Sequence, residues 1–215
     1  MKIFSQAPCR ISLFGGGTDV GEYAQKYGGI CINLAINIRQ EFRIAEKSRE
    51  TPYGKQVGFE FVEKIMKEMG DPDLVYDQTF GGEITGGLGS SASAAVALVG
   101  AINKHKDLGM SRAGIAERAW EIETGSLGLF GGKQDQYVAT FGGINAMEFT
   151  NKVTIVPLAN SFLDHILPGL FLFYTGSNRK SPKIQEGLRT ITSHQKYELD
   201  RIKKTAVEAV PLIGT

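Results

Sequence analysis

Hydrophobic and polar residues alternate in several stretches of the first 160 positions, a pattern typical of half-buried β-strands. The first stretch covers residues 6–14 and ends at three consecutive glycines, which break a strand. A second strand is predicted for 30–38, and residues 41–45 extend it or pair with it. Residues 142–149 and 153–158 are expected to form a pair of strands joined by a short turn.

Helical spacing of hydrophobic residues separates these strands. Thr18 or Asp19 is expected to cap a short helix that runs to residue 27 and closes at a glycine pair. Further helices are predicted for residues 59–69, 90–105, a segment capped by Ser111, and 181–215. The continuous apolar run 167–175 predicts a buried strand, and the polar residues 47–56 a loop. Strands and helices together indicate a mixed α/β fold.

Composition narrows the functional classes. The 215 residues include 24 basic and 23 acidic side chains, and a net charge of +1 gives no indication of nucleic acid or an anionic membrane as partner. Cys9 and Cys31 are too few for a disulfide framework or a cysteine metal cluster. Without a long apolar run or a signal-peptide pattern, a cytoplasmic protein is expected. Glycine is abundant, at 27 residues, and gathers in pairs and triplets that predict turns close to a ligand.

The most informative of these turns lies at residues 84–97, where three glycines and two serines run into an alanine-rich helix. The first N–H groups of a helix have no acceptor within it, and the helix dipole is positive at that end. Such a terminus binds anions, and phosphate is the commonest. A glycine-rich turn that enters a buried helix without any ligand remains an alternative.

Two other glycine turns carry groups suited to phosphoryl transfer. One follows the first strand and is flanked by Arg10 and Asp19; the other lies after Glu123 and presents Asp135. Enzymes that transfer phosphoryl groups mainly position the reactants and neutralise charge. Backbone amides hold the phosphates, a hydroxyl and carboxylates hold Mg²⁺, and a further carboxylate orients the acceptor hydroxyl. A dinucleotide-binding turn is disfavoured, because 15–19 lacks the required glycine spacing.

These residues resemble the motifs of the GHMP kinase superfamily of ATP-dependent small-molecule kinases. The Gly-Leu-Gly-Ser-Ser loop (87–91) is similar to its phosphate-binding motif, and the segments 10–19 and 132–137 look most like those of D-glycero-D-manno-heptose 7-phosphate kinases. The resemblance implies the α+β GHMP kinase fold, with a ribosomal-protein-S5-like N-terminal domain over 1–160 and a partial, truncated C-terminal domain over 161–215. A third glycine-rich motif usual in relatives is missing after residue 149, so a truncated chain is expected.

The resemblance also assigns roles by matched position. Asp135 would be the catalytic base, and Arg10 would stabilise charge at the acceptor or the γ-phosphate. ATP would be held by the phosphate loop and the start of its helix: Gly86, Gly87, Leu88, Gly89, Ser90, Ser91 and Ala92. Mg²⁺ would be held by Ser91 and Glu123. The sugar would lie against Gly16, Gly17, Thr18, Asp19, Lys133 and Gln136, and Lys133 or Arg179 would neutralise a substrate phosphate.

The implied reaction is transfer from ATP to a small-molecule sugar or sugar phosphate, most simply the anomeric hydroxyl of a heptose 7-phosphate. A fucokinase-like kinase and a non-catalytic relative or fragment that binds sugar or nucleotide remain alternatives, and the oligomeric state stays open. Individual residues also have structural interpretations. Glu123 would then be an exposed helix residue, Asp19 a helix N-cap, and Arg10 an ion-pair partner of Asp135.

Overall fold

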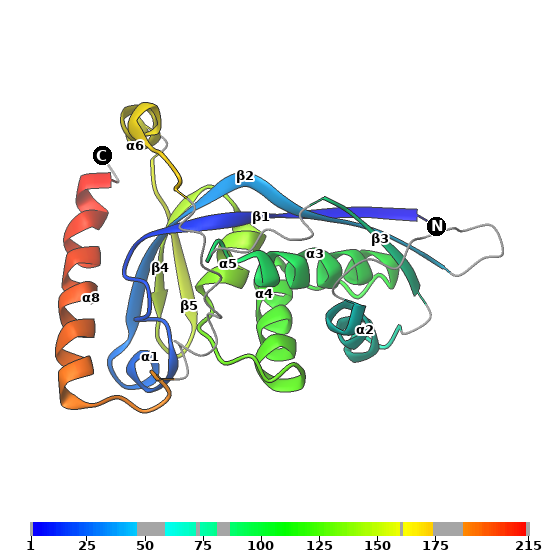
Figure 1. The fold of residues 1–215 in the computed structure, drawn as a ribbon, viewed down its shortest axis with the longest axis horizontal. Coiled ribbons are helices and arrows are strands. Elements are labelled where there is room, and N and C mark those ends of the chain that lie inside the picture. Colours follow the sequence, from blue (N-terminus) through cyan, green and yellow to red (C-terminus); the bar gives the residue numbers. More distant parts are fainter. Residues whose placement is uncertain are drawn as a thin grey trace. The chain divides into compact units, whose positions relative to one another are not determined.

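The computed structural model describes residues 2–46, 59–71, 74–80, 87–159, 161–173 and 187–213. They form two compact units, each assembled from separate parts of the chain. The first unit contains Met1–Cys9, Ile36–Leu129 and Asp135–Phe141, and the second contains Arg10–Ala35, Phe130–Gln134 and Gly142–Thr215. The long strands β1 (Lys2–Phe14) and β2 (Gly29–Glu46) have residues in both units (Figure 1).

In the first unit, helices pack on the second half of β2, residues 36–46. Strand β3 (Leu74–Phe80) pairs antiparallel with that half, from Glu41 opposite Phe80 to Glu46 opposite Leu74. The helices are α2 (Phe59–Glu68), α3 (Ser90–His105), α4 (Arg112–Glu121), a π-helical turn η1 (Ile122–Ser126) and α5 (Gln134–Phe141), whose first residue belongs to the second unit.

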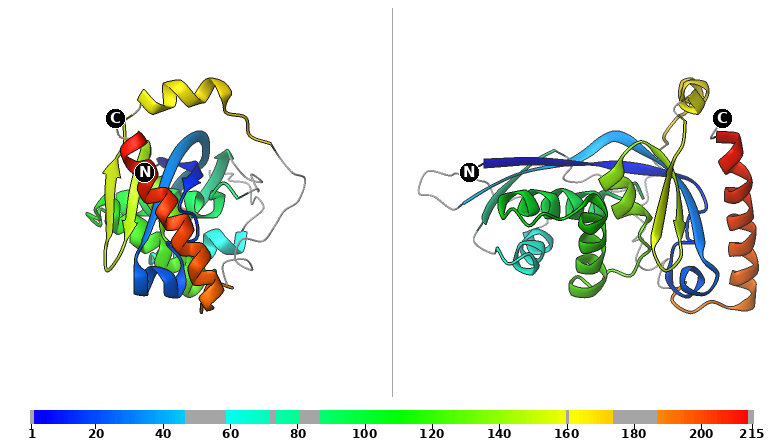
Figure 2. Two further views of the ribbon diagram at one scale, coloured as in Figure 1. Left: turned by 90° about the vertical axis from the view of Figure 1, so that its left-hand side faces the viewer. Right: turned by 180° about the vertical axis from the view of Figure 1, so that it is seen from behind.

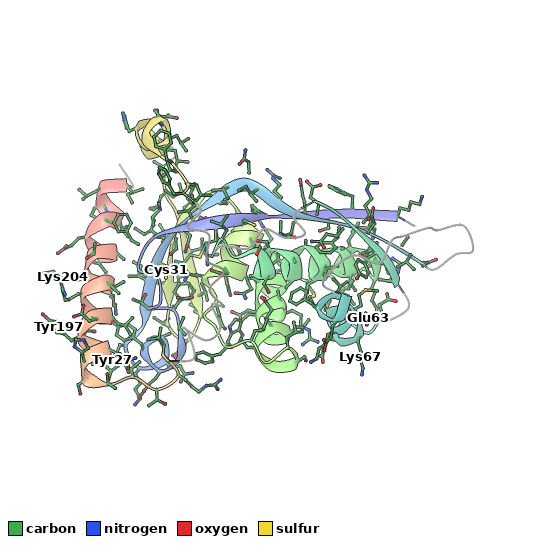
Figure 3. All side chains as sticks on the ribbon, viewed as in Figure 1. Tyr27, Cys31, Glu63, Lys67, Tyr197 and Lys204 are labelled. Atoms are coloured by element: carbon green, nitrogen blue, oxygen red, sulfur yellow. The ribbon has the colours of Figure 1, made fainter. Side chains whose placement is uncertain are left out.

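Helix α3 forms the centre of this unit, because its small and aliphatic residues are buried almost all round the helix. Small side chains let α2 and α4 approach closely, and Val62, Ile65 and Met66 of α2 join the same hydrophobic cluster. Charged residues of α2 such as Glu63 and Lys67 lie on its outward face (Figure 3). The packing therefore fixes the start of α3, where the glycine loop ends.

In the second unit, β2 continues as the centre of an antiparallel sheet. The first half of β2 pairs with β4 (Ile144–Phe149), from Gly29 opposite Phe149 to Leu34 opposite Ile144. β4 pairs in turn with β5 (Val153–Pro157), and the two views of Figure 2 show these strands side by side. This unit also contains α1 (Gly21–Tyr27), α6 (Ser161–Ile166), the single turn η2 (Leu167–Gly169) and α8 (Ser193–Ile213).

Helix α8 packs on the rest of the second unit by one face. Leu199, Ala206, Ala209 and Ile213 are buried on it, whereas Tyr197 and Lys204 lie on the side away from α1 (Figure 3). The Tyr23 hydroxyl of α1 donates a hydrogen bond to Asp200 at 2.8 Å. None of the helices that the structure describes is long and apolar enough to cross a membrane.

Most of the predicted elements are confirmed, including the Ser111 cap, whose hydroxyl accepts a hydrogen bond from Gly114. The buried strand predicted for 167–175 is wrong, because the described part, 167–173, is a single helical turn followed by exposed irregular chain. The C-terminal helix α8 begins at Ser193, and residues 187–192, predicted as helix, form turns, bends and irregular chain instead; residues 181–186 lie outside the described residues. The loop predicted for 47–56 lies outside them, and the domain boundary near residue 160 stays a prediction.

Candidate functional site

The phosphate loop reaches α3 through glycines in left-handed backbone conformations. Gly87 has φ 77° and Gly89 has φ 70°, values that favour glycine over any residue with a Cβ. Gly89 is the N-cap, and the Ser93 N–H donates back to its carbonyl. The N–H groups of residues 90–92 therefore have no acceptor within the helix, which is the arrangement that binds a phosphate. Gly86 lies outside the described residues.

Three predicted site residues meet beside this helix start. The Ser91 hydroxyl donates to Oε1 of Glu123 at 2.6 Å, and Nε2 of Gln136 donates to Oε2 at 2.7 Å. Glu123 is buried, so the interpretation of an exposed helix residue is wrong. Gln136 was expected at the sugar, and the structure places its amide nitrogen on this carboxylate.

The π-helical turn η1 positions Glu123. A π-helix has a wider turn than an α-helix and is frequent at functional sites. Continuing directly from α4, η1 turns the Glu123 side chain toward Ser91, while the Glu123 carbonyl accepts the Leu129 N–H at 2.8 Å. The sequence offers no signal for such a turn, because its residues also suit an ordinary helix end.

Burial raises the pKa of Glu123 from 4.5 to about 7. The hydrogen bonds from Ser91 and Gln136 lower it, whereas the nearby charge of Asp135 in the first turn of α5 raises it. A buried carboxyl that titrates near neutrality would be held in its charged form by a cation. A cation bound beside the carboxylate would lower this pKa again.

The groups present fit Mg²⁺. A carboxylate and a hydroxyl lie within hydrogen-bond distance, and both are hard oxygen ligands. The Gln136 side-chain oxygen is buried without a hydrogen-bond partner among the described residues. No group of three or more His, Cys, Asp or Glu side chains able to hold a metal occurs in the described part of the chain. Mg²⁺ usually takes one or two carboxylates and completes its shell with phosphates and water.

A second cluster lies within the second unit, around Asp19. Its carboxylate is buried and accepts two hydrogen bonds from Gln134, from the backbone N–H at 3.1 Å and from Nε2 at 3.2 Å. The Ser12 hydroxyl donates to the Gln134 side-chain oxygen at 3.0 Å. The Cys31 thiol also lies 3.8 Å from Oδ1, so the Asp19 carboxylate is held in place from several sides.

Gly132 makes room for this carboxylate. A Cβ at residue 132 would collide with the Asp19 Oδ2, so only glycine fits beside Asp19 in this geometry. Glycine at residue 132 does not have a positive φ, so the need is one of space. The motifs 10–19 and 132–137 are therefore in direct contact at Asp19 and Gly132, a contact that we call the interlock.

Neither Thr18 nor Asp19 caps α1. The N-cap is Val20, which makes no side-chain cap. Thr18 is buried instead, and its hydroxyl lies 2.8 Å from the Gly15 carbonyl and 3.1 Å from the Ile30 carbonyl and N–H. The Thr18 hydroxyl thus joins the turn to β2, and the Asp19 carboxylate accepts hydrogen bonds from Gln134. The prediction that either residue caps α1 is therefore wrong.

The other predicted residues of the described part lie on β1, in the turn after it, and just before α5. Gly16 and Gly17 form the turn after β1, and Gly17 has φ 90°. Arg10 is half-buried on β1, and Lys133 is half-buried just before α5. Arg179 lies outside the described residues. The sequence interpretation assigned no role to Ser12, Gln134 or Gly132, although all three stand in the quoted motifs.

The chain is similar to known kinases in sequence and in fold. Residues 59–143 match the family model of the N-terminal domain of GHMP kinases. The chain is 32% identical over 212 residues to D-glycero-alpha-D-manno-heptose 7-phosphate kinase of Campylobacter jejuni. That match covers 86% of this chain and 62% of the relative, so the chain spans less than two thirds of the relative's length.

Solved structures share the fold. A D-glycero-D-manno-heptose 1-phosphate kinase from Bacteroides thetaiotaomicron superposes with a TM-score of 0.76 at 24% identity, over 97% of this chain and 72% of the other. A sugar kinase described as putative, from Campylobacter jejuni, gives 0.69 at 27% identity, over 97% and 71%. Mevalonate kinase of Methanococcus jannaschii gives 0.65 at 16%, over 97% and 73%. The chain is thus similar to GHMP kinases in the sequence of residues 59–143, and it shares its fold with solved sugar and mevalonate kinases.

Proposed function

We propose that this protein transfers the γ-phosphate of ATP to a sugar hydroxyl, and that the sugar is a heptose 7-phosphate phosphorylated at its anomeric hydroxyl. The observation that carries the proposal is the Ser91–Glu123–Gln136 cluster at a helix start preceded by glycines in left-handed conformations. A helix start binds phosphate, and the adjacent hydroxyl and carboxylate suit the cation that accompanies ATP.

In this proposal, the N–H groups at the start of α3 bind the ATP phosphates. Ser91 and Glu123 would hold Mg²⁺, which neutralises charge on the transferred phosphoryl group when it is bound. Gln136 donates to Glu123 and so keeps the carboxylate turned toward Ser91. Each of these groups positions reactants or balances charge, as phosphoryl transfer requires.

On the acceptor side, Asp19 accepts hydrogen bonds from the sugar hydroxyls. Gln134 donates to both oxygens of this carboxylate and so fixes its orientation. Asp135 accepts the proton of the attacking hydroxyl, and Arg10 stabilises charge that develops near it. The choice of a heptose phosphate is supported by the names of the C. jejuni and B. thetaiotaomicron relatives. A fucokinase-like acceptor is the alternative within the same chemistry.

The test is release of ADP in the presence of Mg²⁺, measured against a panel of free and phosphorylated hexoses and heptoses. Turnover of heptose 7-phosphate that is lost in Asp135→Asn and Glu123→Gln, but kept in the exposed neighbour Glu121→Gln, is the expected result. Turnover of a different sugar would retain the kinase and discard the acceptor. Binding of Mg²⁺ and ATP without turnover of any sugar, by a folded sample, would refute the kinase and leave a nucleotide-binding module.

A further inference from the structure

Glu68, the last residue of α2, contacts the chain on both sides of Glu123 within the first unit. On the C-terminal side, the hydroxyl of Ser126, which ends η1, donates to Oε1 of Glu68 at 2.5 Å. On the N-terminal side, Nη2 of Arg118 in α4 donates to the Glu68 carbonyl at 2.8 Å and to Oε2 at 3.5 Å. Glu68 therefore joins the helix that precedes η1 to the residue that ends it.

Helix α2 is itself fixed on α3. Apolar residues of both helices lie in the same hydrophobic cluster. Nζ of Lys106, the residue after α3, donates to the carbonyls of Met69 at 3.2 Å and Gly70 at 2.9 Å, which follow the end of α2. Since α3 carries Ser91 in its first turn, Glu68 and Ser91 belong to the same packed pair of helices.

The π-helical turn η1 has little to hold it by itself, because it is a single turn of helix. The Leu127 N–H donates to the Ile122 carbonyl at 2.9 Å and closes this turn. The Thr124 hydroxyl donates to the Trp120 carbonyl at 2.8 Å, and a side chain that bonds a helix carbonyl in this way favours a bend. A single turn gains few hydrogen bonds for the dihedral angles that it fixes, so η1 depends on its neighbours.

These contacts close a path through the first unit. Ser91 donates to Glu123 at 2.6 Å, η1 leads from Glu123 to Ser126, and Ser126 donates to Glu68. From there α2 packs back on α3, the helix of Ser91. If η1 shifted, Glu123 would move relative to Ser91, and a displacement of about 1 Å at such a site already has a large effect.

The ion pair in this path contributes little to stability as such. The Glu68 and Arg118 side chains are 37% and 31% exposed, and pairs of this kind have small effects on the free energy of unfolding. The same holds for the pair of Arg118 with Glu121, whose side chain is more exposed still. The contacts of Glu68 are therefore better suited to fixing a position than to stabilising the fold.

We propose that Glu68 is a positioning residue for the cation site, which fixes η1 through Arg118 and Ser126 and so sets the distance between Glu123 and Ser91. This inference rests on the proposed function, to which it adds a residue outside the cluster of Ser91, Glu123 and Gln136. A surface cluster that acts on stability alone is the alternative.

The experiment measures how ATP binding depends on Mg²⁺. Calorimetric titration with ATP, in the presence and in the absence of Mg²⁺, is carried out on the wild type, Glu68→Ala and Ser126→Ala. With Mg²⁺ we expect both variants to bind ATP roughly three- to tenfold more weakly, the size of one hydrogen bond. Without Mg²⁺ the affinity should change less than about twofold, because the start of α3 is unchanged.

Two variants of α2 serve as comparisons. Glu63→Ala removes an outward-facing glutamate of the same helix and should bind ATP like the wild type (Figure 3). Glu68→Gln keeps an oxygen that can accept from Ser126, so it should recover most of the Mg²⁺-dependent affinity. Thermal unfolding of each variant checks that the protein is folded.

A second readout needs no ligand. Hydrogen exchange at the Leu127 and Leu129 N–H groups, which donate to η1 carbonyls, should be faster in Glu68→Ala and Ser126→Ala. Glu63→Ala should leave it unchanged. Unchanged exchange in Glu68→Ala would overturn the proposal. Equal losses of ATP affinity with and without Mg²⁺ would also overturn it, in favour of a role in stability alone.

Both readouts are independent of the sugar, which separates this inference from the proposed function. A Mg²⁺-dependent loss of ATP affinity in Glu68→Ala, in a protein that turns over no sugar, would refute the kinase and support the positioning role. Sugar turnover with the same Mg²⁺-dependent ATP affinity in Glu68→Ala and the wild type would do the reverse. Wild-type binding of ATP that is indifferent to Mg²⁺, without turnover, would overturn both.

Discussion

At the scale of a residue, Glu123 shows which properties of a site could be predicted from the sequence and which could not. Its type and approximate position could be predicted from the resemblance, but its burial and its two hydrogen bonds could not. Its burial and hydrogen bonds depend on the π-helical turn η1, whose residues also suit an ordinary helix end, and on Ser91, 32 residues earlier in the chain. Gln134 was missed for the same reason, since its role depends on a contact with Asp19 across 115 residues.

The raised pKa of Glu123 predicts a pH-dependent stability. Between about pH 4.5 and 7 the folded protein keeps a proton that the unfolded chain has released, so the free energy of unfolding falls as the pH rises through this range. Without metal, Glu123→Gln should be more stable than the wild type at pH 8, by up to about 3 kcal/mol. Urea unfolding at pH 4 and pH 8 measures the difference. A wild-type minus variant difference that does not change with pH would contradict the assignment.

The same titration should govern Mg²⁺. A metal ion binds the ionised carboxylate, so Mg²⁺-dependent binding of ATP should strengthen as the pH rises toward 7 and level off above it. The pH dependence should disappear in Glu123→Gln and persist in Glu121→Gln. Calorimetric titration with ATP in the presence and absence of Mg²⁺ provides the measurement. If Glu123→Gln retains the full pH dependence, another group is responsible.

Gly132→Ala tests the interlock with Asp19. The added Cβ meets the Asp19 Oδ2, so the carboxylate must move away from Gln134. We expect a loss of stability of about 1–3 kcal/mol, as for other overpacked sites, and a raised KM for the sugar. Gly125→Ala is the matched control, because a Cβ there meets open space. If both variants behave alike in denaturant unfolding, the proposed collision does not occur.

At the scale of an element, α8 illustrates which features a periodic pattern predicts. Its apolar face and helical form could be predicted from spacing, although it begins at Ser193. Its docking could not, because Tyr23 and Asp200 are 177 residues apart and neither is unusual for its element. Helix pairing depends on such specific contacts, whereas helix formation depends on local periodicity.

Tyr23→Phe tests the docking of α8. The hydroxyl is removed and the ring stays, so only the hydrogen bond to Asp200 is lost. The free energy of unfolding should drop by about 1 kcal/mol, with faster hydrogen exchange in α8. Tyr197→Phe, on an exposed tyrosine of the same helix, should have no effect on either. Unchanged exchange in α8 of Tyr23→Phe would show that the contact does not hold the helix.

At the scale of the whole molecule, the resemblance predicted the superfamily and the α+β class, and the hydrophobic pattern most of the element order. The one strand it misplaced, at 167–175, is instructive. Alternation and apolar runs report which residues would gain from burial. They do not report whether a surface is present to cover them, and Phe171 and Phe173 are 73% and 82% exposed.

That exposed segment should influence association. Leu170, Phe171, Leu172 and Phe173 form a continuous exposed apolar run, of a kind that soluble proteins usually cover. The wild-type sedimentation coefficient is expected to rise with protein concentration, and Phe171→Ser with Phe173→Ser should reduce that rise. Tyr197→Ser, at an isolated exposed ring, serves as the control. Identical sedimentation of all three proteins would show that the run does not mediate self-association.

The interlock of Asp19 and Gly132 has a consequence for how related sequences can diverge. Because the carboxylate of one residue fills the space that any side chain at the other would need, neither position can change alone without cost. The backbone carbonyl oxygen of residue 19 also lies only 2.7 Å from the position of a Cβ at residue 132, so a shorter side chain at residue 19 would not by itself admit alanine at residue 132. Glycine at residue 132 should therefore persist in related sequences even where residue 19 varies, and a designer who seeks a new sugar specificity must leave it unchanged.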